Sequence, residues 1–165
     1  MTIEQDEPAG MPERTLHHAS DITEDDAWAI FEFLMPRLEA QEAAHGAETE
    51  EHRTAGALAQ VMSGLVLQLE WDIRAPFWKP YRNRSGPTTV LVWAPPPEAE
   101  LRAQDEQRLD RIRDTWNTLC EALRSWHDSE GYDVARWHKV DFRDAAAAAL
   151  YEQRVSDLGL RREKR

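Results

Sequence analysis

The sequence predicts a mainly α-helical fold: a four-helix antiparallel bundle-like domain with a proline-rich excursion and a short two-stranded antiparallel pair. The strongest observation is a run of apolar residues spaced alternately three and four apart between Leu109 and Trp126, which is typical of one face of a helix. Three further segments carry helix signals, and most connections between them are short, as in antiparallel bundles. The expected helices span residues 24–45, 49–71, 97–128 and 141–158.

Length and charge place this fold in one domain. The 165 residues are enough for a core, and we assign residues 21–160 to the domain, 1–20 to a disordered acidic tail and 161–165 to a basic tail. The formal net charge is −11, and residues 1–52 hold 14 acidic residues against two basic ones. An acidic chain is a poor general nucleic-acid binder, because phosphate contacts supply most of that affinity.

The beginning of the sequence also bears on location. Its first ten residues lack the apolar run of a secretory signal, and no apolar stretch is long enough to span a bilayer. We therefore expect a cytoplasmic protein with no membrane segment. The single cysteine, Cys120, excludes an internal disulfide. We interpret it as a small buried hydrophobe, with a nucleophile as the alternative.

The first helix is expected to begin after Thr23, a residue type that caps helices. Asp25 and Asp26 follow in the first turn, where the helix dipole favours anions. Pro36 lies inside the pattern and either kinks or breaks the helix, because proline removes one backbone hydrogen bond. The helix is expected to end near Gly46.

The second helix has a wider apolar stripe and a row of small residues beside it. Its stripe is Leu58, Met62, Leu65 and Leu69, widened by Val61 and Val66. The small row consists of Ala55, Ala59 and Ser63, which would let a neighbouring helix come close. Gly64 is costly inside a helix, so we expect it either to serve that close approach or to bend the helix.

The excursion, residues 72–96, interrupts the helical pattern. Six of the nine prolines lie between Pro76 and Pro97. Residues 88–93 are rich in β-branched side chains and predict a strand. The best partner is 132–140, where Val134, Arg136, His138 and Val140 alternate with Ala135, Trp137 and Lys139, so we expect the two to pair antiparallel.

The last two helices complete the predicted bundle. Pro97 suits the first turn of the third helix, whose two tryptophans and four aliphatic residues need a covering surface. Its stripe is also a candidate homodimer seam, because the spacing suits a coiled coil. Asp141 is expected to cap the fourth helix, and the alanines at 145–149 favour it intrinsically.

The most distinctive binding candidate is a basic and aromatic segment at the start of the excursion. Arginines beside aromatic rings can hold phosphates and stack bases, and they are also typical of protein-interface hot spots. A surface loop folded onto the bundle explains the same composition. The candidate interaction residues are Arg74, Phe77, Trp78, Lys79, Tyr81, Arg82 and Arg84.

A metal site is a weaker candidate. Glu42 and His45 have the spacing found in di-iron bundles, and Glu48 and His52 lie close by. Such a site needs a second Glu-x-x-His pair, which the sequence lacks. A solvated charged turn explains these residues better, so we expect no metal and no cofactor.

The histidines His127 and His138, which flank the turn at Gly131 among several carboxylates, could form an acid–base pair. The sequence has no phosphate loop, nucleophile elbow or paired Cys-x-x-Cys, so we assign no catalytic residues. We expect a non-enzymatic helical module that binds another protein or itself. The alternatives are a metal- or small-ligand-dependent helical enzyme and a nucleic-acid accessory protein that uses residues 74–84.

Overall fold

The structure, a computed structural model, describes residues 15–74 and 96–158, and they are mainly helical. The helices are α1 (Glu24–Ala43), α2 (Glu50–Arg74), α3 (Glu98–Leu123) and α4 (Ala145–Asp157), with short 3-10 helices η1 (Ala19–Asp21) and η2 (Arg124–Trp126). The two expected tails lie largely outside the described residues, as do the candidate strand 88–93 and most of the excursion. No helix in the described ranges has the length and apolar character needed to cross a bilayer.

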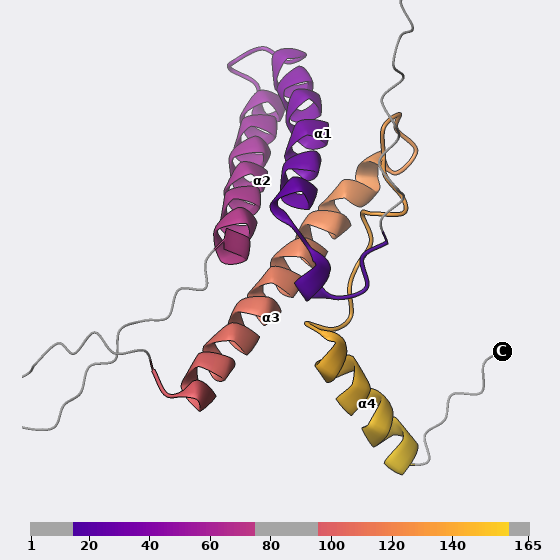
Figure 1. The fold of residues 1–165 in the computed structure, drawn as a ribbon. Helices are drawn as coiled ribbons and strands as arrows, with labels where there is room; N and C mark the ends of the chain where they lie inside the picture. Colours follow the sequence, from indigo (N-terminus) through magenta and orange to yellow (C-terminus); the bar gives the residue numbers. More distant parts are fainter. Residues whose placement is uncertain (1–14, 75–95, 159–165) are drawn as a thin grey trace, which may run out of the picture.

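Helices α1 and α2 form an antiparallel hairpin, and α3 packs across it (Figure 1). Helix α4 extends away from the hairpin (Figure 1), and none of its residues is buried. Its start is tied to α3 by an ion pair between Arg143 and Glu106, 2.9 Å apart. The core is therefore shared by three helices and the segments that flank them, and the expected four-helix packing is not seen for α4. The physical reason is that the alanines of α4 offer little apolar area to bury.

Helix α1 begins where its sequence predicts and runs unbroken through Pro36. The carboxylate of Asp26 accepts hydrogen bonds from the backbone N–H and the hydroxyl of Thr23, both at 2.7 Å. Pro36 and Glu32 are both exposed, so water can reach the Glu32 carbonyl whose helical partner proline removes. The helix is therefore not broken at this proline.

Small residues on α2 let it approach α1 closely, as predicted. Ala55 and Ala59 are buried between the helices. A Cβ atom added to Gly56 would lie 2.9 Å from a carboxylate oxygen of Glu42 on α1, so no larger residue fits without a shift. Gly64 differs, because a Cβ added there meets nothing within 4 Å. Its small size therefore serves no contact within the described part of this chain.

The apolar stripe of α3 is the centre of the core. Trp116, Leu119 and Leu123 are completely buried, and the Trp116 indole N–H donates to the His138 carbonyl at 2.9 Å. Because the stripe is covered within one chain, it is not available as a homodimer seam. Helix α3 ends at Leu123, earlier than predicted, and η2 tightens the following turn.

Residues 132–140 form turns and not the expected strand. Trp137 and Val140 are both buried, yet residues three apart point to opposite faces of a strand. In a turn both side chains can be buried. The backbone of Val140 bonds to the side chain of Asn117, which donates to the Val140 carbonyl at 3.0 Å and accepts from the Val140 N–H at 2.9 Å. Because Trp137 and Val140 both belong to the same core, a turn replaces the expected strand.

The segment after this loop pairs with the start of the described chain. The N–H groups of Ala19 and Ser20 donate to the carbonyls of Phe142 and Arg143 at 3.0 and 2.9 Å. This extended pairing uses residues 142–143, so α4 begins at Ala145 and its cap is Asp144, not the expected Asp141. The Asp144 side chain accepts from the Ala147 N–H at 2.7 Å.

We predict that Asn117→Ala destabilises the fold, because it leaves both backbone groups of the buried Val140 unpaired. Each unpaired buried group costs about 1–3 kcal/mol, which urea denaturation would measure. Thr118→Ala is the matched control, since its exposed side chain bonds only to its own helix. Equal stability of the two variants would contradict this role for Asn117.

Candidate functional site

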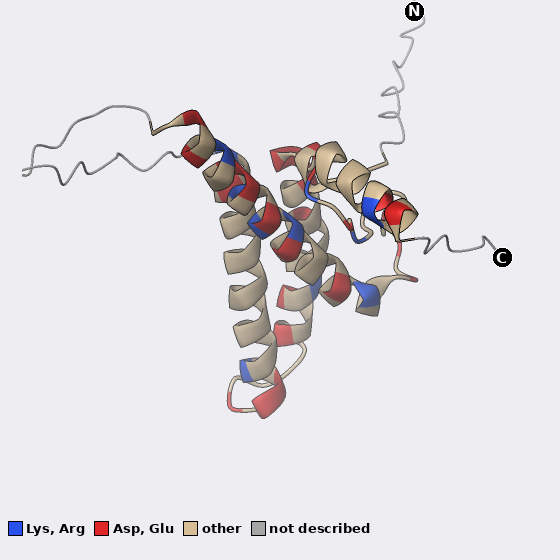
Figure 2. Ribbon diagram, turned by 90° about the horizontal axis from the view of Figure 1, so that it is seen from below, with Lys and Arg blue, Asp and Glu red and all other residues tan. Residues whose placement is uncertain are grey.

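The feature that stands out is a helix with apolar residues on two sides. Residues 54–69 of α2 contain no charged residue, and the ribbon of α2 is uncharged over most of its length in Figure 2. One side of this stretch packs into the core through Met62, Val66 and Leu69. The other side faces solvent. We call the exposed apolar and small residues on this side, together with Trp71 just beyond the stretch, the open face of α2: Ala57, Val61, Gly64, Leu67 and Trp71.

The large apolar side chains of the open face are more than half exposed. The exposed fraction is 59% for Val61, 52% for Leu67 and 60% for Trp71. Single exposed apolar residues are ordinary, but a contiguous group along one helix is a mark of an interaction surface. The sequence reading placed Leu58 and Val61 in the buried stripe, and this placement was wrong. Helices α1 and α3 cover only one flank of α2, so these two residues remain outside.

Both buried carboxylates near the C-terminal end of α2 are held by arginines from neighbouring turns and helices. Asp72 accepts from the Arg111 guanidinium of α3 at 2.9 Å. Glu70 pairs with Arg74 at 2.8 Å and accepts from the Trp28 indole of α1 at 3.4 Å. These contacts join α2 to both neighbours and keep its open face in one orientation. The carboxylates are thus engaged in holding the helix.

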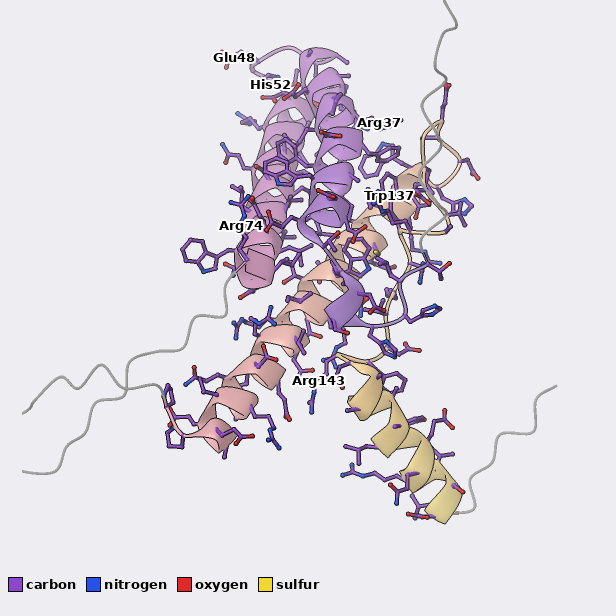
Figure 3. All side chains as sticks on the ribbon, in the orientation of Figure 1. Arg37, Glu48, His52, Arg74, Trp137 and Arg143 are labelled. Carbon is purple, nitrogen blue, oxygen red and sulfur yellow. The ribbon has the colours of Figure 1, made fainter. Side chains whose placement is uncertain are left out.

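Of the predicted interaction residues, the structure places Arg74 alone. Figure 3 shows it at the end of α2 that lies far from the hairpin tip. Its guanidinium is 2.8 Å from Glu24 on α1, and this hydrogen-bonded carboxylate raises the pKa of Arg74. Arg74 is therefore paired with acids and not poised for phosphate. The other six, Phe77, Trp78, Lys79, Tyr81, Arg82 and Arg84, lie outside the described residues.

The residues considered for a metal lie at the hairpin tip, where Figure 3 labels Glu48 and His52. One ring nitrogen of His52 is 2.9 Å from the Glu42 carbonyl, and the other is 3.4 Å from its carboxylate. His45 and Glu48 are exposed. Within the described ranges, no three histidine, cysteine or acidic side chains are grouped so that they could hold a metal ion. The contacts between His52 and Glu42 hold the start of α2 against the end of α1.

A hollow lies beside the end of α3, with a volume of about 290 Å³. His127, His138 and Cys120 all line it. The His138 ring is 2.8 Å from the Leu16 carbonyl, while His127 is 3.1 Å from the neighbouring Asp128. The two histidines thus have separate partners and do not share a carboxylate. Burial raises the pKa of the Cys120 thiol to about 12, which makes it a poor nucleophile.

A buried ion pair fixes the loop that forms this hollow. The completely buried Asp26 at the start of α1 lies 2.7 Å from Arg136. Such a pair holds two segments in register, and breaking it leaves a buried charge. It explains the position of the loop without requiring chemistry there.

Comparison with known proteins identifies no relative: no family model matches the chain, and no curated protein or solved structure matches it either.

We predict that Cys120 is nearly inert in the folded chain. A pKa raised from 9.0 to about 12 lowers the thiolate fraction at pH 8 by about a thousandfold. The reaction of an aromatic disulfide reagent with the folded chain should be slower by at least that factor than its reaction with the same chain in urea. Similar rates in both states would contradict the burial of this thiol.

Proposed function

We propose that this protein is a non-enzymatic helical interaction module that binds a polypeptide through the open face of α2. The exposure of Val61 and Leu67 on a helix stretch without charges, with Trp71 just beyond its end, carries the proposal. Covering one such side chain stabilises a complex by about 1.5–3 kcal/mol before the costs of association. An apolar helix face of this kind fits a partner helix, because ridges of side chains on one helix fill grooves on another.

The rigidity of α2 also supports docking. Ion pairs join its end to α1 and α3, and the contact between His52 and Glu42 joins its start to α1. A surface that is already in its bound conformation loses less conformational entropy when a partner arrives. The open face therefore suits binding better than a mobile segment of the same composition would.

The basic and aromatic segment 74–84 remains a predicted second contact. It continues directly from α2, so its residues follow Trp71 within 13 positions of the chain. A partner on the open face would be close to the beginning of this segment. Trp78→Ala is expected to weaken binding if the segment takes part.

We predict that a photoreactive phenylalanine analogue placed at Val61 forms covalent adducts with a partner polypeptide upon illumination in the native host. The same analogue at Gln107, an exposed position on α3, is the matched control and should form few. The adducts at position 61 should disappear when Gly64→Glu places a charge on the open face. Mass spectrometry would identify the second chain in each adduct.

Equal adduct yields at positions 61 and 107, or adducts at 61 that persist with Gly64→Glu, would show that the open face is not a specific binding surface.

A further inference from the structure

We propose that the polypeptide bound by the open face of α2 is a second copy of this chain, packed antiparallel about a twofold axis. This inference rests on the proposed function and names its partner. The two-fold arrangement requires one surface to be complementary to itself, and the residues along α2 meet that requirement.

Charge restricts where two copies can meet. The chain has a formal net charge of −11, and residues 1–52 hold 14 acidic residues against two basic ones, so two copies repel where these residues face one another. Residues 54–69 of α2 form a long exposed helix stretch without an acid. Contact between copies along this stretch brings no like charges together and removes apolar side chains from water.

The two ends of the open face are complementary to each other. Arg53 and Trp71 are both exposed. They are 18 positions apart, which is about five helical turns, so they lie on the same side of α2 about 27 Å from each other. In an antiparallel pair, each Arg53 lies beside the Trp71 of the other copy, and a guanidinium on an indole face is a favourable contact. The twofold axis produces two copies of the Arg53–Trp71 contact in the dimer.

The same register also matches side-chain sizes between the ends. A step toward the C-terminus on one helix is a step toward the N-terminus on its antiparallel neighbour. The register that pairs Arg53 with Trp71 therefore pairs Ala57 with Leu67 and Gln60 with Gly64. Each pair sets a larger side chain against a smaller one, which lets two helices interdigitate.

Gly64 has no packing role among the residues that the structure describes. Glycine inside a helix is unfavourable by about 1 kcal/mol relative to alanine, and no described atom lies within 4 Å of a Cβ added at this position. A second α2 passing near the symmetry axis would occupy that space. The glycine then permits the close approach that the sequence suggested, but between two copies and not between α1 and α2.

Light scattering after size-exclusion chromatography tests the inference on the full chain. The expected result is a dimer mass at micromolar concentration. Gly64→Glu should give a monomer mass and remain folded and helical, because no described atom lies within 4 Å of a Cβ added at this position. Gln107→Glu, which makes the same charge change on exposed α3, should remain dimeric. A wild-type chain that is monomeric up to about 100-fold higher concentration, or a dimeric Gly64→Glu variant, overturns the proposal.

Disulfide trapping tests the orientation. One chain carries Arg53→Cys and a second, differently tagged chain carries Trp71→Cys, while the buried native Cys120 stays unreactive. Antiparallel packing predicts rapid oxidation between the two different chains and little 53–53 linkage, since those positions are about 27 Å apart. This mixed pair keeps one intact Arg53–Trp71 contact. Predominant 53–53 and 71–71 linkage would indicate parallel packing and overturn the stated geometry.

The photocrosslinking and mass measurements separate the two proposals. Adducts at position 61 with a different protein, together with a monomeric chain, would overturn the dimer and leave the interaction module standing. Absence of specific adducts at position 61 would overturn both.

Discussion

The burial of Trp116 organises the rest of the structure. Its indole is completely covered, and its N–H donates to the His138 carbonyl, so one residue joins the helical core to the loop that follows it. The neighbouring Asn117 holds the backbone of Val140 from the same helix. Because α3 supplies both contacts, the loop is built onto α3 and the α1–α2 hairpin closes over the opposite side of the stripe.

Buried carboxylates then determine how the hairpin sits on this core. Asp26 pairs with Arg136 of the loop, and Asp72 pairs with Arg111 of α3. Buried charges of this kind contribute more to orientation than to net stability, since desolvation opposes their attraction. Their effect on function is indirect: they hold α2 with one side in the core and the other side in water.

The sequence predicted the elements that depend on local signals and missed those that depend on neighbours. The cap at Thr23 and the stripe containing Trp116 were both recognised from spacing and residue type, and the structure confirms them. The loop 132–140 was wrongly read as a strand, because alternation cannot show that Trp137 and Val140 are buried on the same side. Leu58 and Val61 were wrongly placed in the core, since periodicity does not reveal how many helices cover α2. The absence of charge between 54 and 69 was the available signal for a second apolar side.

The amino-acid sequence by itself determined a helical fold, the starts of the first three helices and the buried stripe of α3, because hydrophobic spacing and capping act within a few turns of one chain. The tertiary structure alone decided which apolar residues are actually covered. Whether an apolar side chain is buried depends on contacts between distant segments, such as α3 against the hairpin and residues 18–20 against 142–143. It left Val61, Gly64 and Leu67 exposed, and this outcome, which hydrophobic spacing alone does not contain, defines the open face of α2.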